Sequence, residues 1–168
     1  MKILETKNLI LRHYTSDDAQ FIIRLLNEPS FIKNIGDRKV NTKEAAENYI
    51  ASRLTASYEK NGFGLYMVEL KDGTPIGMCG LVKRDPNEDP DIGFALLPEY
   101  WRKGYTFEAS LGVLEYAKKT LGLTRVLGIT IPSNTPSIKT LEKLGLKFIK
   151  TDIAKETGDE IRVYEILF

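Results

Sequence analysis

Cysteine and histidine are almost absent from this sequence, which limits the chemistry that it can perform. Its 168 residues include one cysteine, Cys79, and one histidine, His13. A single cysteine cannot form a disulfide within the chain, and such sparing use of cysteine fits a reducing cytosol. A zinc site of histidine and cysteine needs more ligands than these, and a histidine-based triad would have to use His13. We therefore expect a cytoplasmic protein with no metal in its site.

A strong net charge and long apolar segments are also missing. The formal net charge is +1, so no overall field draws the chain to nucleic acid or to an anionic membrane. No apolar run approaches the length of a membrane span, and the first residues, MKILETKN, are too charged and too short for a signal peptide. Neither nucleic acid nor a membrane is expected as a partner.

The spacing of apolar residues predicts a single domain over residues 1–168 that mixes strands and helices. The expected strands are Leu4–His13, Phe63–Leu70, Ile76–Val82, Asp91–Leu97, Arg125–Ile131, Lys147–Ala154 and Arg162–Phe168. The expected helices begin near residues 15–18, 41–44, 104–107 and 134–137, and Phe31–Val40 is expected to form a loop or a short helical turn. The sheet is then largely antiparallel, and a parallel pair is allowed where the third helix connects the strands at 91–97 and 125–131.

Two details of these elements bear on chemistry. Cys79 falls inside the strand Ile76–Val82, which favours a small buried apolar residue over a nucleophile. The helix that begins at 104–107 is predicted to bury one apolar stripe. Its members are Phe107, Leu111, Leu114, Ala117 and Leu121.

The segment from Asp91 to Ala109, DIGFALLPEYWRKGYTFEA, is the most informative part of the sequence. It predicts a buried strand, a loop that contains Gly104, and the first turn of a helix. Such a loop leaves backbone N–H groups unpaired at the positive end of a helix dipole, which favours a phosphate or a diphosphate. Arg102 and Lys103 add positive charge, although such residues also occur in ordinary turns. If the strands at 91–97 and 125–131 are neighbours, the helices that follow both begin at one edge of the sheet.

Three segments of the chain resemble the GNAT superfamily of N-acetyltransferases, in its RimJ/RimL-like branch. IGFALLPEYWRKGYTFEA is similar to the acetyl-CoA motif of that family, NTPSIKTLEKLGLKF is similar to its second cofactor motif, and LRHYTSDDAQFI is typical of how the branch begins. The loop retains Gly104 of the motif, whereas Trp101 stands where the wider family has Gln or Arg, and Thr106 replaces a small residue. The resemblance implies a largely antiparallel central sheet whose two middle strands are splayed apart and flanked by helices.

The resemblance also implies where acetyl-CoA, the acetyl donor, would bind. Its pantetheine arm would lie between the splayed strands and pair with free backbone groups near Ala95, Leu96 and Leu97. Its diphosphate would lie on backbone N–H groups of the loop and the first helical turn. The residues implied there are Arg102, Lys103, Gly104, Tyr105, Thr106 and Phe107. Asn134 matches a motif residue near the pantetheine, and it is equally suited to cap the helix that follows.

The chemistry implied is direct attack of an amine on a thioester, which needs no covalent nucleophile but does need proton transfer. Ser137 matches the proton donor proposed in the branch, and it also fits a first-turn serine bonded to its own helix. Asp91 matches a strand position where several family members hold a catalytic Glu, and it also fits a solvent-exposed aspartate at a strand entrance. Glu69 is a further candidate base at a strand end. Leu141 stands where many family members have a tyrosine acid.

The sequence therefore predicts an N-acetyltransferase that moves an acetyl group from acetyl-CoA to a primary amine, either a protein N-terminus or a small molecule. A non-catalytic acyl-CoA-binding sensor is the alternative within the same fold. A nucleotide-phosphate-binding module is a third alternative, although the loop reads Lys-Gly-Tyr-Thr where a P-loop has Gly-Lys-Ser/Thr. The amine acceptor would contact Phe31–Val40, the second helix and the last hairpin. The apolar end of the chain, YEILF, also allows a homodimer.

Overall fold

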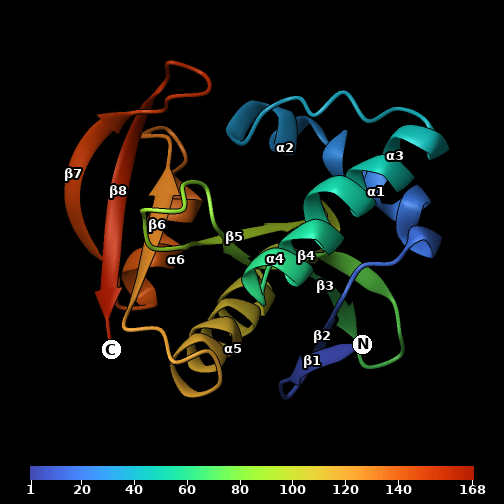
Figure 1. Ribbon diagram of the computed structural model, residues 1–168, viewed down its shortest axis with the longest axis horizontal. Helices are drawn as coiled ribbons and strands as arrows, with labels where there is room; N and C mark the ends of the chain where they lie inside the picture. Colours follow the sequence, from blue (N-terminus) through green and yellow to red (C-terminus); the bar gives the residue numbers. More distant parts are fainter.

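The computed structural model describes residues 1–168 and contains one sheet of eight strands (Figure 1). The order across the sheet is β1-β2-β3-β4-β5-β6-β8-β7, and every neighbouring pair is antiparallel except β5 with β6. The strands are β1 Lys2–Glu5, β2 Leu9–Arg12, β3 Leu65–Leu70, β4 Pro75–Val82, β5 Asp91–Leu96, β6 Arg125–Thr130, β7 Lys147–Ile153 and β8 Glu160–Leu167. The predicted mixed α/β class with a largely antiparallel sheet is confirmed.

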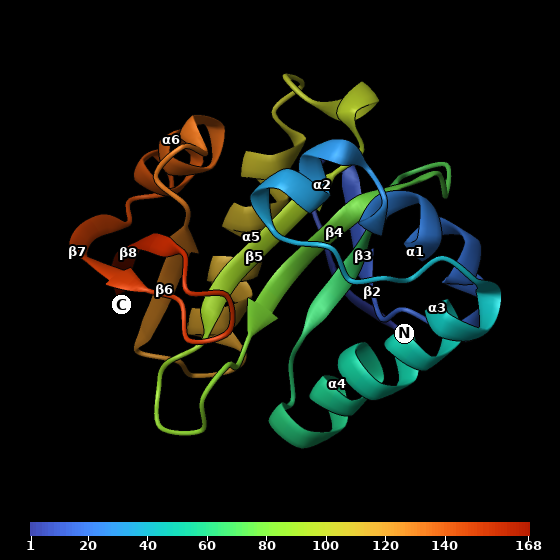
Figure 2. The ribbon, with the colours of Figure 1, turned by 90° about the horizontal axis from the view of Figure 1, so that it is seen from above.

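Helices cover both faces of this sheet. Figures 1 and 2 show α1, α2 and α3 over one face and α5 across the other. The helices are α1 Ala19–Leu26, α2 Pro29–Asn34, α3 Lys43–Tyr49, α4 Ala56–Asn61, α5 Tyr105–Lys119 and α6 Thr135–Lys143. A π-helical stretch, Ile50–Thr55, joins α3 to α4 without a break. None of these helices combines the length and the apolarity that crossing a bilayer requires.

The two middle strands of the sheet touch only briefly. Asp91 lies opposite Leu127 and Ile92 lies opposite Gly128, and no further residues of β5 and β6 are paired. Beyond this point β5 stays paired with β4, and β6 stays paired with β8. The facing edges of β5 and β6 therefore leave backbone groups without a sheet partner. The splay that the family resemblance implied is confirmed.

The first predicted strand, Leu4–His13, is wrong, because two strands with a turn between them occupy it. Glu108 of α5 fixes this turn by accepting hydrogen bonds from Thr6 Oγ1 at 2.6 Å and from the Asn8 backbone N at 2.7 Å. The alternation of apolar residues continues through the turn, so the local pattern did not reveal it. The chain reverses here because a side chain 100 residues away binds its polar groups.

The buried face of α5 also differs from the predicted stripe. Leu111 is 42% exposed, whereas Ser110 is fully buried against the sheet. The residues of α5 that are buried are Ala109, Ser110, Val113, Leu114 and Ala117. Three of these five side chains are small, which lets the helix lie close to the sheet. The predicted stripe is therefore wrong in part, because it assigned the buried face of α5 from the large apolar side chains.

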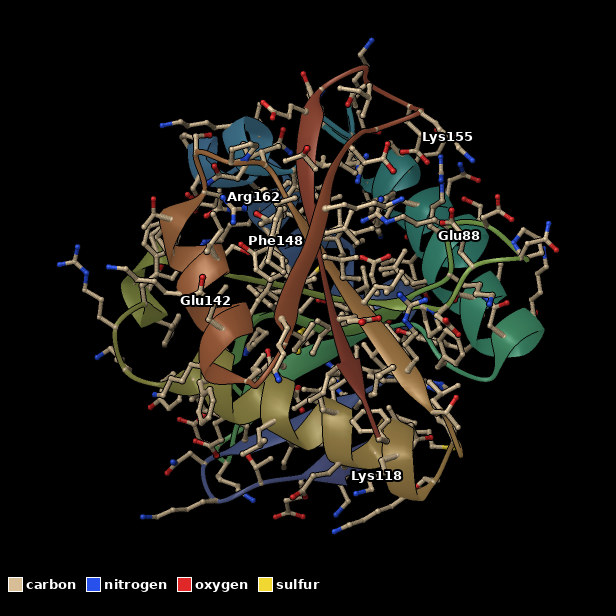
Figure 3. All side chains as sticks on the ribbon, turned by 90° about the vertical axis from the view of Figure 1, so that its left-hand side faces the viewer. Glu88, Lys118, Glu142, Phe148, Lys155 and Arg162 are labelled. Atoms are coloured by element: carbon tan, nitrogen blue, oxygen red, sulfur yellow. The ribbon has the colours of Figure 1, made fainter.

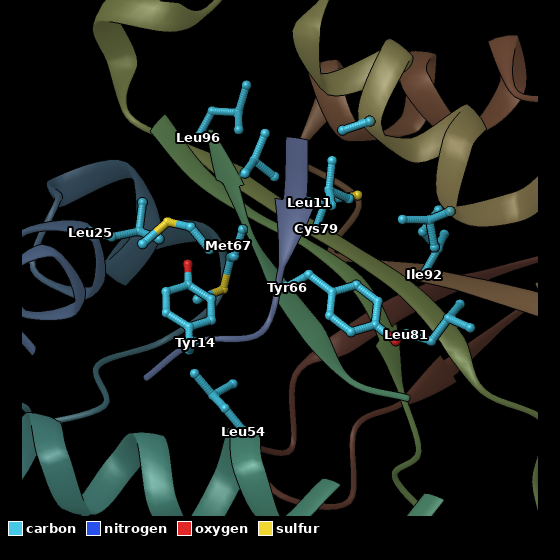
Figure 4. Close-up of a cluster of buried hydrophobic side chains, with 14 of the residues drawn as sticks. Leu11, Tyr14, Leu25, Leu54, Tyr66, Met67, Cys79, Leu81, Ile92 and Leu96 are labelled. Atoms are coloured by element: carbon cyan, nitrogen blue, oxygen red, sulfur yellow. The ribbon is translucent and has the colours of Figure 1, made fainter. Parts of the chain in front are cut away.

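The hydrophobic core lies on both sides of the sheet. Figure 4 shows part of it, with Leu25, Tyr14 and Met67 grouped together and Cys79 beside the strands. The Tyr14 hydroxyl can be buried in this core because it donates a hydrogen bond to the Gly77 carbonyl at 3.0 Å. Cys79 is fully buried, as the sequence predicted.

Candidate active site

A cavity of about 460 Å³ opens between three parts of the chain. They are the α1–α2 corner, the end of β5 with the loop into α5, and the first turns of α6. Figure 2 shows α2 above β5, with α6 to one side. The predicted cofactor residues that line the cavity are Ala95, Leu96, Arg102, Gly104, Tyr105, Thr106, Phe107, Asn134 and Ser137. The structure thus brings together two motifs that lie some thirty residues apart in the sequence.

The N-terminus of α5 opens on this cavity without a capping side chain. Gly104 is the N-cap residue, and its φ of +80° is a left-handed conformation that glycine adopts without strain. Side chains cap α3 and α6, through Thr42 and Asn134, but none caps α5. The backbone N–H groups of residues 105–107 therefore have no acceptor within the helix. Together with the helix dipole they form an anion-binding position on the cavity wall.

The end of β5 offers fewer free backbone groups than predicted. The Leu97 backbone N donates to the Ile76 carbonyl at 2.9 Å, so Leu97 is bonded to the β4 side. Successive residues of an antiparallel strand direct their backbone groups alternately to its two neighbours. The backbone groups of Ala95 therefore also point to β4, whereas those of Phe94 and Leu96 point into the gap between β5 and β6. Of the three residues expected to offer free backbone groups, only Leu96 is directed correctly.

Positive charge lies on the loop and on α6. Arg102, Lys139 and Lys143 line the cavity, and the ammonium of Lys143 lies 4.2 Å from the centre of the Phe107 ring. Lys103, which the resemblance also implied, lines a separate groove between β1 and the outer side of α5. The cations at the cavity and the N-terminus of α5 together favour an extended anionic ligand.

Ser137 presents a hydroxyl that has no hydrogen-bond acceptor in the protein. Asn134 caps α6, its Oδ1 accepting from the Ser137 backbone N at 3.4 Å. The cavity also contains Thr140, whose Oγ1 instead donates to the Pro136 carbonyl at 2.9 Å. The Ser137 hydroxyl is therefore not bonded to its own helix, and it can donate to a molecule in the cavity.

Asp91 does not line the cavity, and it is not exposed to solvent either. It is 2% exposed at the start of β5, where its carboxylate binds Arg84 through contacts of 2.8 Å and 3.2 Å. Burial raises the pKa of Asp91, although the Arg84 guanidinium acts in the opposite direction. The predicted solvent exposure of Asp91 is wrong, because Arg84 from the loop before the strand binds its carboxylate inside the protein. Its catalytic role stays a prediction.

Glu69 is likewise held away from the cavity. Its carboxylate lies 3.0 Å from the Arg12 guanidinium, which also binds Asp18 at 2.9 Å. Glu69 lies on β3 opposite Ile10 of β2. The structure thus gives two of the three predicted catalytic residues ion-paired positions outside the cavity and places only Ser137 in its wall.

Glu28 lines the cavity and was missed by the sequence analysis. It is the only acidic residue in the cavity wall, and its half-buried carboxylate has no ion-pair partner. It stands directly before Pro29, the first residue of α2. Because a Glu-Pro pair after an apolar helix is typical of a helix end, the local sequence gave no sign that the chain begins a new helix beside a cavity.

The single cysteine and histidine lie outside the cavity. Burial raises the pKa of Cys79 to about 12, and its Sγ lies 3.6 Å from the Ser110 hydroxyl. His13 stacks on Tyr58 with ring centres 3.9 Å apart, and burial lowers its pKa. The structure contains no group of three or more acidic, cysteine or histidine side chains able to hold a metal ion.

Comparison with known proteins identifies one family over most of the chain. The family model described as "Acetyltransferase (GNAT) domain" matches residues 8–147. The uncharacterized N-acetyltransferase YoaA of Bacillus subtilis is 30% identical over 149 residues, which cover 86% of this chain and 82% of that protein. The FsC-acetyl coenzyme A-N(2)-transacetylase of Aspergillus fumigatus is 25% identical over 156 residues, which cover 88% of this chain and 66% of that protein.

Solved structures show the same fold. RimL, the ribosomal L7/L12 alpha-N-protein acetyltransferase in complex with coenzyme A, superposes with a TM-score of 0.88 and 13% identity, covering 100% of this chain and 98% of the other. At that identity the likeness concerns the arrangement of the chain alone. The match extends over the splayed strands and the helices on both sides of them.

Proposed function

Because this chain belongs to the GNAT family of acetyltransferases, we propose that it transfers the acetyl group of acetyl-CoA to a primary amine by direct attack. The observation that carries the proposal is the uncapped N-terminus of α5, which opens on the same cavity as the free hydroxyl of Ser137. A helix N-terminus favours a diphosphate, and a hydroxyl can donate to a departing thiolate. One cavity therefore offers groups for two distant parts of the donor.

The residues around the cavity fit acetyl-CoA. The backbone N–H groups of residues 105–107 would hold the diphosphate, and Arg102 and Lys139 would add positive charge beside it. The backbone groups of Phe94 and the backbone N–H of Leu96 face the gap and would bond the amides of the pantetheine arm, whereas the Leu96 carbonyl already accepts from Trp101. When bound, acetyl-CoA supplies an acetyl group activated as a thioester.

Ser137 is proposed to donate a proton, or a hydrogen bond, to the leaving thiolate. Its hydroxyl has no acceptor in the protein, and the cap from Asn134 fixes the turn that carries it. A thiol has a pKa near 8.5, so the thiolate is a tolerable leaving group and the donor needs to help only modestly. A weak acid such as serine is sufficient for this role.

Glu28 is proposed to accept the proton of the amine through water. It takes the role expected of Asp91 or Glu69, because both of these are ion-paired outside the cavity. An α-amine has a pKa of about 7.7–8.0 and is partly neutral near pH 7, whereas a lysine amine near 10.4 is almost wholly charged. One carboxylate acting through water therefore suits an α-amine or another amine of low pKa.

A screen of amines with acetyl-CoA tests this function. The panel contains peptides with different N-terminal residues, small α-amines, and peptides whose only free amine is a lysine side chain. Release of the CoA thiol and the mass of the acetylated product are both followed. We expect turnover with α-amines. Binding of acetyl-CoA without turnover on any amine would favour a sensor, and tighter binding of ATP than of CoA would favour a nucleotide-binding module.

A further inference from the structure

β7 forms one outer edge of the sheet, and the rest of the chain leaves it uncovered. All seven of its residues, Lys147–Ile153, are exposed. In Figure 1 β7 is the outermost strand, and Figure 3 views the molecule from that side. β8, which carries the apolar end of the chain, is paired with β6 on one side and with β7 on the other. The free edge in this half of the sheet therefore belongs to β7.

The backbone of β7 directs groups outward at alternate residues. The Ala154 backbone N, just after the strand, donates to the Asp159 carbonyl at 2.8 Å, so Ala154 bonds toward β8. By alternation, the N–H and C=O groups of Ile153 and Thr151 point away from β8. The Ile153 backbone N accordingly donates to the carboxylate of its neighbour Asp152, 2.8 Å away, and not to β8. An open strand edge of this kind is a template on which another strand can pair.

Two large apolar side chains lie along this edge. Phe148 is 48% exposed and Ile153 is 57% exposed. They stand opposite Tyr164 and Glu160, which are an even number of residues apart on β8, so both project from the same face of the hairpin. A β-bulge between Phe148 and Lys150 brings this about, because it adds one residue to β7. Exposed apolar side chains beside a free strand edge indicate an interaction surface.

Charged side chains determine which strand fits this edge. Lys150 and Asp152 stand opposite Val163 and Ile161, so they share the other face of the hairpin, where they form an ion pair at 3.1 Å. If two copies of β7 pair antiparallel about Thr151, each Lys150 stands opposite the partner's Asp152. Pairing about Lys150 or about Asp152 would instead place like charges directly opposite each other, which is destabilising.

We propose that β7 pairs with β7 of a second copy of this chain, antiparallel and centred on Thr151. The two Thr151 residues exchange two backbone hydrogen bonds, and two ion pairs between Lys150 and Asp152 flank them. Beyond the bulge, Phe148 of each copy lies beside the partner's Ile153. An edge lysine opposes any strand that brings no acidic residue opposite it, so these charges favour a second copy over other partners.

Charge reversal tests this pairing through the oligomeric state. A single pair of strands is a small interface, so we expect a reversible dimer with a Kd on the order of 10–100 μM, measured by analytical ultracentrifugation. Lys150→Asp and Asp152→Lys each place like charges opposite each other, and each should raise the Kd at least about tenfold. The double variant Lys150→Asp/Asp152→Lys restores both ion pairs and should dimerise like the wild type. Lys118→Asp makes the same change of charge at an exposed residue of α5 and should leave the Kd unchanged.

A cysteine on the proposed axis tests the register. Two Thr151 residues that exchange backbone bonds would have Cα atoms about 5.5 Å apart, within the range of a disulfide. Thr151→Cys should therefore cross-link the dimer under mild oxidation, whereas Thr157→Cys, in the exposed hairpin turn, should not. Cys79 is fully buried and takes no part.

Four outcomes would overturn the inference. They are a wild type that is still monomeric at about 1 mM, a dimer that survives both single charge reversals, a double variant that stays monomeric, and cross-linking of Thr157→Cys as readily as of Thr151→Cys. All of these variants change exposed side chains, and circular dichroism checks that each is folded.

Discussion

The indole Nε1 of Trp101 donates a hydrogen bond to the Leu96 carbonyl, 2.9 Å away. That carbonyl lies on the edge of β5 that faces the gap, and Trp101 begins the loop that leads to Gly104. The bond therefore joins the strand that would hold the pantetheine to the loop that would hold the diphosphate. Gln and Arg, the residues of the wider family pattern at this position, also carry N–H donors. Trp101 thus keeps a donor there with a different side chain.

Gly104→Glu is expected to weaken CoA binding at least about tenfold, a loss of about 1.4 kcal/mol or more. The new carboxylate would lie beside the anion-binding N-terminus of α5 and repel the diphosphate. Gly62→Glu is the matched control, because Gly62 has nearly the same φ, +79° against +80°, and neither site has an atom within 4 Å of the added Cβ. Calorimetry that finds Gly104→Glu folded and within about threefold of wild-type affinity, roughly 0.7 kcal/mol, contradicts the anion site.

Ser137→Ala should lower kcat by roughly ten- to a thousandfold with little change in the KM for acetyl-CoA. The substitution removes a hydroxyl that no protein group binds, so the fold loses no hydrogen bond. Thr140→Ala is the control within the same cavity, since that hydroxyl donates to its own helix at Pro136. Steady-state kinetics over about pH 6–9 on one good acceptor compares the two variants. If Ser137→Ala keeps the wild-type kcat across this range, Ser137 does not donate to the leaving thiolate.

Glu28→Gln should change the pH dependence of kcat/KM, whereas Asp91→Asn should not. Glu28 lines the cavity, so its amide variant is expected to lower kcat/KM and flatten the acidic limb of the profile. Asp91 binds Arg84 away from the cavity, so its amide variant should keep the shape of the wild-type profile. The reverse pattern, with only Asp91→Asn flattening the acidic limb, would identify Asp91 on β5 as the base.

Cys79→Ala is expected to keep turnover, and no acetylated enzyme should accumulate in either form. The thiol is fully buried and its pKa is raised to about 12, so essentially no thiolate forms near pH 7. Intact-protein mass spectrometry during turnover follows any acetyl adduct. An acetylated side chain that forms and decays at the rate of turnover would contradict direct attack and indicate a two-step reaction through an acetyl-enzyme.

Asp18→Asn should lower the free energy of unfolding at neutral pH by about 1–3 kcal/mol, the scale of hydrogen bonds to a charged group. Asp18 accepts two bonds from Arg12 at 2.9 Å and one from the Thr15 backbone N at 2.8 Å. Burial opposes ionisation, but these bonds outweigh it and lower the pKa of Asp18 below 3.8.

The sign of this effect fixes its pH dependence. The folded state favours the ionised carboxylate, so the stabilisation is full above the unfolded pKa of about 3.9 and is lost as pH falls through the lower folded pKa. Urea unfolding should therefore show a wild-type advantage that is constant from about pH 7 to 5 and shrinks below about pH 4. Asp17→Asn, an exposed neighbour without an ion pair, should show no such trend.

The loop around Gly104 could be predicted from the sequence because its causes are local. A buried strand, a glycine and a helical repeat follow one another within twenty residues, and each constrains the backbone where it stands. Asn134 was predicted as a cap for the same reason, and it does accept from the Ser137 backbone N. The two motifs then needed only adjacent strands to meet at one cavity.

The carboxylates could not be assigned from the sequence, because their partners are fixed by the tertiary structure. Asp91, Glu69 and Glu28 are chemically similar, and their local sequences do not reveal which of them pairs with an arginine. Glu108 shows the same limit, since it binds the Thr6 hydroxyl 102 residues away and thereby shapes the first hairpin. Apolar patterns describe which faces are buried, and they carry no record of charge pairing.

The two-residue contact between β5 and β6 makes the sheet two ribbons rather than one continuous layer. Backbone bonding that runs from β1 to β5 is interrupted in the middle and resumes from β6 to β7. An extended molecule that bonds to the free edge of β5 acts as a temporary strand. It continues the backbone hydrogen bonding of the sheet into part of the gap. The amide hydrogens of Phe94 and Leu96 then exchange with solvent at rates set by occupancy of the gap, and the supply of ligand governs how cooperatively the two ribbons unfold.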